Sequence, residues 1–169
     1  MAAQILVMLL LPAVLVAAAG WDLASFTIPN FLPACLIAGF VLFVPAAHLT
    51  FHAILLHLLA GLVGLCVSFT LFALGYIGGG DAKLFAAIAL WLGFVDLGGF
   101  AVAASLFGGL LTLTLLMLRQ WTLPDIMARQ HWIGRLHAPN GGIPYGVALA
   151  AGAFAILPHT EIFRLAAGG

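Results

Sequence analysis

The chain has 169 residues, of which 65% are hydrophobic and only 6% are charged, and its formal net charge is zero. A soluble domain carries roughly 25% charged residues, so a soluble fold could not hide this much apolar surface. The balanced charge gives no indication of nucleic-acid binding. The composition therefore predicts a single membrane-embedded domain over residues 1–169, because no polar stretch is long enough to fold alone.

Long apolar runs predict an all-α fold, a polytopic membrane helix bundle. About 20 apolar residues cross the hydrocarbon core as a helix, and helices satisfy their own backbone groups in lipid. The alternation typical of a membrane barrel is absent. We expect about six transmembrane helices, near residues 2–20, 31–47, 51–74, 82–95, 98–118 and 143–160.

The first and fourth spans, and the boundary after the fourth, each have more than one interpretation. No basic residue precedes the run at 2–20, so we expect a retained span and not a cleaved signal peptide. The fourth span has only about 14 residues, or about 21 Å of helix, so it crosses fully, is sunk at one end, or is re-entrant. A soft boundary at residues 96–99 also leaves a five-span arrangement open.

The basic residues predict which ends of the helices face the cytoplasm, because cytoplasmic loops carry an excess of Lys and Arg. With six spans, the connections 21–30, 75–82 and 119–142 lie on one side of the membrane. That side and its edges carry four of the five basic residues, and the other side carries only Arg164. We expect both termini outside and the three connections inside. The basic residues of the inner side are Lys83, Arg119, Arg129 and Arg135.

The sequence lacks the residues that a metal site or a nucleophilic (serine or cysteine) hydrolase would need. Cys35 and Cys66 stand alone in apolar runs, which favours buried free thiols. His48 and His52 have helical ligand spacing, but they lack an acidic partner and are better read as helix-end residues. His57 is expected to be a hydrogen-bonded packing residue. No serine stands in a GxSxG turn, and we expect neither a metal nor another cofactor.

Two of the five acidic residues are predicted to share one face of the membrane. Asp22 follows the first span, and Asp81 opens the fourth span after three glycines. Charged groups at membrane depth are costly and usually functional. The plainer interpretation is that Asp81 caps a helix and Asp22 is a loop residue. It suits Asp96, on the opposite face, and Asp125, in the long loop, better.

A pair of carboxylates suits acid–base hydrolysis of an amide. When two carboxyls lie close together, one holds a proton at a pH where the other is ionised. The ionised group takes a proton from water, and the protonated group polarises the scissile carbonyl. The pair titrates as a unit, so the residues alone assign neither role to Asp22 or Asp81.

Three segments resemble the GxGD aspartyl peptidases, and specifically the prepilin peptidases. Residues 78–84 (GGGDAKL) match the motif with Gly78, Gly80 and the second aspartate. Residues 22–30 (DLASFTIPN) are similar to the first-aspartate motif, in which Pro29 holds an extended turn and Asn30 can cap the next helix. Residues 142–148 (GIPYGVA) are similar to the opening of the final span, where Tyr145 would sit near the site.

The resemblance implies that Asp22 and Asp81 are the catalytic pair. It implies cleavage of the leader from a prepilin or pseudopilin at the cytoplasmic face of the bacterial inner membrane. The short chain resembles the Flp/Tad type and lacks the insertion with CxxC pairs of the longer, methylating members. It departs from the family in having no basic residue between Asp22 and Pro29, which puts substrate contacts in that loop in doubt.

Lys83 has two readings, a contact with the substrate or a side chain that reaches lipid phosphates. The alternative to a peptidase is a non-enzymatic membrane protein, such as a transporter subunit or an assembly scaffold, in which the acids serve an ion pathway. Besides the substrate, membrane lipid is the expected partner. The sequence does not indicate an oligomeric state.

Overall fold

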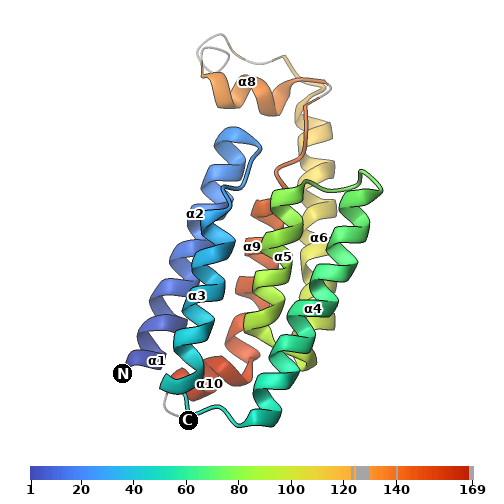
Figure 1. The fold of residues 1–169 in the computed structure, drawn as a ribbon. Coiled ribbons are helices and arrows are strands. Elements are labelled where there is room, and N and C mark those ends of the chain that lie inside the picture. Colours follow the sequence, from blue (N-terminus) through green and yellow to red (C-terminus); the bar gives the residue numbers. More distant parts are fainter. Residues whose placement is uncertain (123, 125–129, 140, 168–169) are drawn as a thin grey trace.

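The structure is a computed structural model that describes residues 1–122, 124, 130–139 and 141–167. The regular structure of these residues is helical, and the longest helices run side by side (Figure 1). The helices are α1 (Ala2–Ile5), the π-helical segment η1 (Leu6–Leu10), α2 (Leu11–Ser25), α3 (Phe31–Ala46), α4 (Phe51–Ala73), α5 (Gly79–Leu92), α6 (Phe94–Leu118), α8 (His131–His137), α9 (Tyr145–Ile156), the 3₁₀ segment η2 (Leu157–His159) and α10 (Glu161–Ala167).

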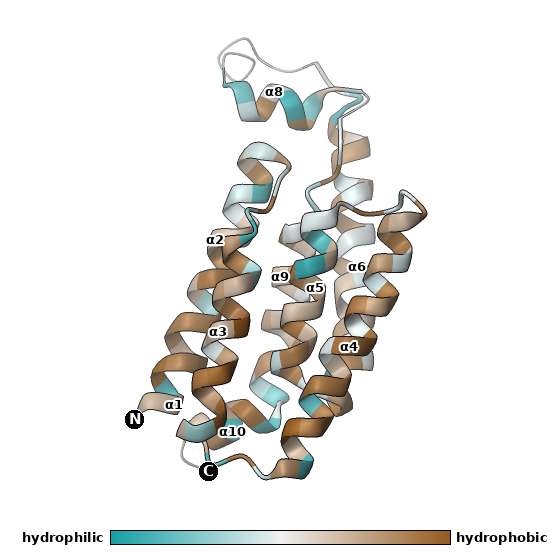
Figure 2. Ribbon diagram, viewed as in Figure 1, coloured by the Kyte–Doolittle hydropathy of each residue, from teal (hydrophilic) through white to brown (hydrophobic). Residues whose placement is uncertain are grey.

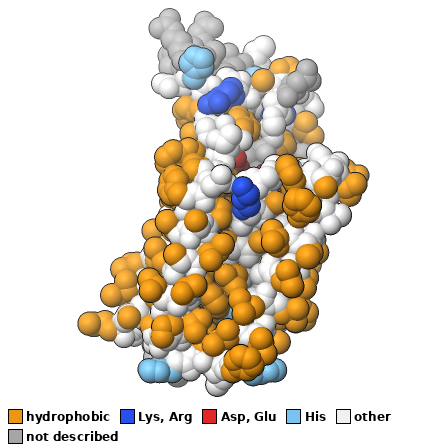
Figure 3. All heavy atoms as spheres, in the orientation of Figure 1, with side chains coloured by type: hydrophobic (Ala, Val, Ile, Leu, Met, Phe, Trp, Pro, Cys, Tyr) orange, Lys and Arg blue, Asp and Glu red, His pale blue; other side chains and the backbone are white. Residues whose placement is uncertain are grey.

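The chain is a polytopic helical membrane protein, as its composition predicts. Among the described residues, three helices are long and apolar enough to cross a membrane, namely Ala2–Ser25, Phe51–Ala73 and Phe94–Leu118. Tyr145–His159 and Glu161–Ala167 together meet the same test, although they are bent by 61°. Their outer surfaces carry apolar side chains along most of their length (Figures 2 and 3).

The sequence predicts about six spans, and two of the expected spans correspond to helices shorter than a full crossing. Helix α3 has 16 residues and α5 has 14, or about 24 and 21 Å at 1.5 Å per residue. Helix α5 has contacts with α3, α4, α6, α9 and α10. Protein therefore surrounds much of α5, and a helix so placed does not need the length that a lipid-facing helix requires.

The C-terminal half of α5 lies in the hydrophobic core of the bundle. Trp91 is fully buried, and its indole Nε1 donates a hydrogen bond of 2.8 Å to the carbonyl oxygen of Leu36. The rings of Phe40 and Phe43 pack on this indole with centroid separations of 5.7 and 5.4 Å. The His57 ring forms a 2.8 Å hydrogen bond with the Leu90 carbonyl, which confirms that His57 is a packing residue.

The two ends of the bundle differ in polarity. Helix α8 and the connection from α4 to α5 lie at one end, and α10 and the N-terminus lie at the other (Figure 1). Basic side chains gather near the α8 end in Figure 3, with histidines at the opposite end. Of the predicted inner basic residues, Arg129 lies outside the described residues, as does Asp125.

The prediction of buried thiols is wrong. Cys35 and Cys66 are free but exposed on the surface of the bundle. An apolar run in a membrane protein faces lipid as readily as it faces protein, because lipid is as apolar as the core. Apolar surroundings in the sequence therefore do not distinguish the two locations.

Candidate active site

Asp22 lies inside a helix and not in the loop that the sequence suggests at residues 21–30. Helix α2 continues to Ser25, five residues beyond the expected span, and places Asp22 in its last turns. Its carboxylate Oδ2 accepts a hydrogen bond of 2.6 Å from the backbone N–H of Gly146, and the residue is only 4% exposed. The interpretation of Asp22 as an ordinary loop residue is therefore wrong.

The turn after Asp22 is unusual in its backbone conformation. Helix α2 ends because Phe26 has φ = 55° and ψ = 28°, a left-handed conformation that is uncommon for residues other than glycine. The Arg135 guanidinium from α8 lies over the Phe26 ring at 5.9 Å and also donates a hydrogen bond to the Ala24 carbonyl. Helix α8 is thereby attached to the end of α2, and the chain turns back toward α3.

Asp81 lies in the first turn of α5, and its carboxylate forms one local hydrogen bond. Its Oδ2 accepts a 3.1 Å hydrogen bond from the backbone N–H of Gly78, so the helix-cap reading of this residue holds in part. A Cβ on Gly78 would lie 2.9 Å from the same oxygen. The other oxygen, Oδ1, is buried and has no hydrogen-bond partner among the described residues. A cap leaves no reason for that second oxygen to be buried alone.

Close backbone packing brings the two aspartates to one place. A Cβ on Gly80 would lie 3.0 Å from Ile28 Cβ and 3.2 Å from the Ile28 backbone, so the start of α5 touches the segment after α2. Ile28 also lies against Gly146, the residue that holds Asp22. Ile28 therefore links the turn that carries Asp81 to the residue that holds Asp22.

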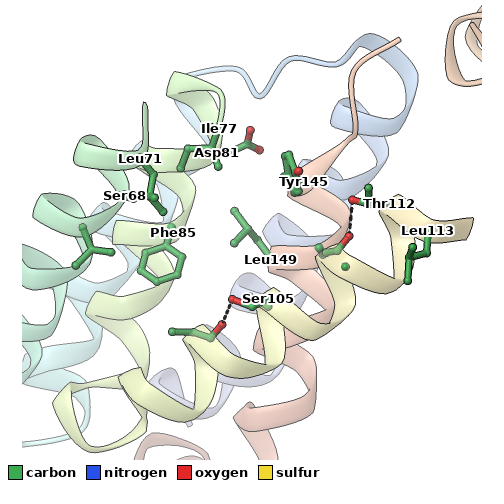
Figure 4. Close-up of a pocket in the computed structure, with 16 residues that line it drawn as sticks. Ser68, Leu71, Ile77, Asp81, Phe85, Ser105, Thr112, Leu113, Tyr145 and Leu149 are labelled. Atoms are coloured by element: carbon green, nitrogen blue, oxygen red, sulfur yellow. Dashed lines mark hydrogen bonds between the residues drawn. The ribbon is translucent and has the colours of Figure 1, made fainter. Parts of the chain in front are cut away.

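A cavity of about 580 Å³ opens beside Asp81. In Figure 4, the Asp81 carboxyl from α5 points across this cavity toward Tyr145 from α9, and Leu149 lies beneath them. The α6 wall is built mainly from small residues at helical spacing. The hydroxyls of Ser105 and Thr112 on this wall donate hydrogen bonds to backbone carbonyls one turn earlier in α6 (Figure 4). The cavity is therefore apolar except at the Asp81 end. The small residues of the α6 wall are Ala101, Ala104, Ser105, Gly108, Gly109 and Thr112.

Lys83 and Asn30 join the two aspartate segments through their side chains. The Lys83 ammonium donates a 2.7 Å hydrogen bond to the Asn30 Oδ1. The prediction that the Asn30 side chain caps the second helix is wrong, because α3 has no side-chain cap bond and this oxygen is taken by Lys83. Pro29 stands in the irregular stretch before α3, and its carbonyl accepts a 3.1 Å bond from Leu32.

Some candidate residues of the sequence are not brought together. Asp96 lies in the first turn of α6, at the opposite end of the bundle from Asp22 and Asp81. His48 and His52 flank the start of α4 at that same opposite end. The described residues contain no cluster of three or more His, Cys, Asp or Glu side chains that could hold a metal ion.

Sequence reasoning assigned no role to three residues that build the site, although Ile28 and Gly146 stand within the segments that resemble the family. Gly146 supplies the N–H to Asp22, and Ile28 separates Gly80 from Gly146. The Ser68 hydroxyl in α4 lies 2.7 Å from the Gly64 carbonyl oxygen and 2.9 Å from the Ala82 carbonyl oxygen, so its single proton lies between α4 and the first turn of α5. A small or polar residue within a span was the available signal for Gly146 and Ser68. Ile28 has no such signal.

These observations define the class of the protein, a polytopic helical membrane protein with two carboxylates at one end of its bundle. Residues 9–113, more than half of the chain, match the type IV leader peptidase family, and the chain belongs to that family. The matched residues include both aspartates, whereas Tyr145 and α9 follow them. Comparisons with curated proteins and with solved structures found no match.

Proposed function

We propose that the protein is an aspartic endopeptidase that removes the leader from a prepilin or pseudopilin, with Asp22 and Asp81 as its acid–base pair. Membership in the type IV leader peptidase family implies aspartic-type prepilin peptidase activity. The observation that carries the proposal is that buried Asp22 from α2 and Asp81 from α5, which has one buried oxygen, come together around Ile28, with a cavity beside Asp81. Residues 1–169 contain no CxxC pair of the kind that the methylating members carry, and this favours a substrate of the Flp/Tad type.

The proposed chemistry needs no group beyond the two carboxyls and a water molecule. The ionised carboxyl takes a proton from water as the water oxygen attacks the scissile carbonyl carbon. The protonated carboxyl gives its proton to the carbonyl oxygen, which yields a neutral tetrahedral diol. Collapse of the diol breaks the C–N bond: the leaving nitrogen takes up the proton that the first carboxyl had accepted, and one diol hydroxyl returns its proton to the second carboxylate as the new carbonyl forms. The pair ends the cycle with one proton, as it began.

The cavity beside Asp81 supports a substrate whose apolar helix enters from the membrane. Small residues on a helix face let another helix approach closely, and the α6 wall presents them from Ala101 to Thr112. Because the hydroxyls on that wall already form hydrogen bonds within α6, an apolar helix can pack against the wall without leaving these hydroxyls unpaired. In this arrangement the peptide at the polar end of the substrate helix reaches Asp81.

The distribution of basic residues supports a cytoplasmic site in the bacterial inner membrane. Lys83, Arg119 and Arg135 lie at the aspartate end, and Arg164 lies in α10 at the other end. Cytoplasmic ends carry the excess of Lys and Arg. We propose that Lys83 and Asn30 hold the two aspartate segments together at this face, and that Tyr145 contacts the substrate or the Asp81 carboxyl.

The test is leader removal in purified form. Wild type and the variants Asp22→Asn and Asp81→Asn are incubated in detergent with a Flp-type prepilin, and the product is measured by mass. We expect cleavage by wild type and a loss of at least about 100-fold in both variants, because each asparagine can neither accept nor deliver the proton, and general acid–base catalysis contributes about 10²–10⁴-fold.

Asp96→Asn is the matched control, since this carboxyl lies at the opposite end of the bundle. It should cleave like wild type. Substantial processing by folded Asp22→Asn would refute the acid–base pair. If folded wild type cleaved none of several prepilins and pseudopilins, the peptidase proposal itself would fail and the transporter or scaffold reading would replace it.

A further inference from the structure

The Asp22 carboxylate is held by the first turn of a distant helix. Helix α9 begins at Tyr145, so Gly146 is its second residue and its N–H has no partner within the helix. That N–H donates the 2.6 Å hydrogen bond to Asp22 Oδ2 across 124 positions of sequence. An N-terminal N–H of a helix also favours a negative charge through the helix dipole. Asp22 therefore serves as the cap of α9 from another helix.

The contact leaves no room for a side chain at position 146. A Cβ there would lie 2.9 Å from Asp22 Oδ2, 3.0 Å from Asp22 Cβ and 2.9 Å from Ile28 Cδ1. Asp22 and Ile28 are both buried, so neither can move into solvent to make space. Alanine at 146 would push the carboxyl away from the N–H that holds it.

We propose that Gly146 is a positioning residue that fixes the Asp22 carboxyl for catalysis, through its N–H and through the absence of a side chain. This inference rests on the proposed function, since it concerns the same aspartate pair. Gly146 follows Tyr145, which lines the cavity next to Asp81. The start of α9 thus supplies one residue to the Asp22 side and one to the cavity side of the site.

The functional consequence follows from the geometry that acid–base catalysis requires. Asp22 belongs to α2 and Asp81 to α5, and the relative position of their carboxyls depends on how these helices are tied together. Displacement of a catalytic group by about 1 Å costs roughly 100-fold in rate. The N–H of Gly146 limits that displacement without touching the substrate.

The first test compares Gly146→Ala with Gly20→Ala in the prepilin cleavage assay. Gly20 lies in α2, two residues before Asp22, and a Cβ there would meet nothing within 4 Å. We expect kcat of Gly146→Ala to fall about 100-fold with KM within about threefold, because the displaced group acts on the chemical step and not on binding. Gly20→Ala should retain wild-type kcat. A Gly146→Ala enzyme that is folded and cleaves at the wild-type rate would overturn the proposal.

The second test needs no substrate and reports the contact through stability. Asp22→Asn keeps an oxygen that can accept from Gly146, whereas Asp22→Ala leaves that buried N–H without a partner. We expect Asp22→Asn to melt near wild type in detergent and Asp22→Ala to melt about 3 °C lower or more. The Asp22→Ala penalty should be largely absent in the Gly146→Ala background, where the contact is already broken.

The two tests separate failure of this inference from failure of the proposed function. Equal melting of Asp22→Asn and Asp22→Ala, or additive penalties in the double variant, would overturn the contact whatever the activity. A wild-type protein that cleaves no prepilin would overturn the peptidase proposal, while the melting comparison would still decide whether Gly146 holds Asp22.

Discussion

The three glycines before Asp81 have different structural roles, and the sequence motif does not distinguish these roles. Gly78 leaves space for the Asp81 carboxyl to reach its N–H, since a Cβ would lie 2.9 Å from Asp81 Oδ2. Gly80 lets the Ile28 backbone approach to a distance that no side chain permits. Gly79 meets only the Phe72 ring, at 3.3 Å or more, and a ring at the end of a side chain can move. The outer two glycines shape the site, and the middle one does not.

This difference predicts unequal effects of alanine at neighbouring positions. Gly80→Ala forces α5 away from residue 28 by a few tenths of an ångström and so shifts Asp81 relative to Asp22. We expect its kcat/KM for prepilin cleavage to fall at least tenfold, on the scale of losses from small misplacement of catalytic groups. Gly79→Ala should stay within about threefold of wild type, because only the Phe72 ring must adjust. Purified variants compared in the same cleavage assay give both numbers.

The comparison carries its own control for folding, since both variants alter the same turn of α5. Equal activities for Gly79→Ala and Gly80→Ala would contradict the assignment of Gly80 to the contact between the aspartate segments. A lower melting temperature for Gly80→Ala alone is consistent with it, because the contact also joins α5 to the segment after α2.

At the scale of the helices, hydropathy predicts their existence better than their ends. The helical fold and the membrane class follow from apolar runs, because lipid leaves the backbone no alternative to helices. The end of the first helix does not follow from them. Hydropathy falls at Trp21 and Asp22, yet α2 continues to Ser25, whose hydroxyl bonds to the Trp21 carbonyl at 2.7 Å. Polar residues extend a helix beyond the apolar part when their side chains find partners.

The site shows the same division between local and distant information. Counting spans and basic residues predicts that Asp22 and Asp81 share an end of the bundle, and their motifs are local in sequence. The partner of Asp22 could not be predicted this way, because Gly146 is 124 residues away and its role depends on how α9 packs against α2. The side chain of Asn30 likewise bonds to Lys83, 53 residues away, and not to its own helix.

The α6 wall of the cavity yields a prediction about substrate binding. Gly109 lines the cavity, and a Cβ there would meet nothing within 4 Å, so a leucine fills the cavity without a clash at its base. We expect Gly109→Leu to raise KM for prepilin at least tenfold, about 1.4 kcal/mol of lost binding, with a smaller change in kcat. Gly98→Leu is the matched control, because Gly98 is on the same helix, has equally open space and does not line this cavity.

A KM for Gly109→Leu equal to that of Gly98→Leu would show that the substrate helix binds elsewhere. Melting temperatures near wild type are expected for both variants, since neither leucine displaces a packed atom at the Cβ position. A difference in KM between the two variants therefore reports whether the substrate occupies the cavity, and not whether the fold is less stable.

At the scale of the whole molecule, one end of the bundle carries Asp22, Asp81 and most of the basic residues, and the other is formed by α10 and the N-terminus (Figure 1). Arg119 ties the basic end together, with 2.7 and 2.9 Å hydrogen bonds to the carbonyls of Leu136 and Gly142. The contacts of Arg119 hold the end of α8 and the residues just before α9 against the end of α6. Arg119 and Arg135, which contribute to the predicted cytoplasmic location, thus also shape the end that carries the proposed site.

This orientation predicts opposite labelling of two engineered cysteines. Gln120 and His159 are exposed at the two ends of the bundle, after α6 and before α10 respectively. In a background with Cys35 and Cys66 replaced by alanine, a membrane-impermeant maleimide applied to intact spheroplasts should label His159→Cys and spare Gln120→Cys. Inside-out vesicles should give the reverse, because the Lys and Arg excess places the aspartate end in the cytoplasm. Labelling of Gln120→Cys from outside would place the aspartates on the far side from a prepilin leader and would exclude processing at the cytoplasmic face.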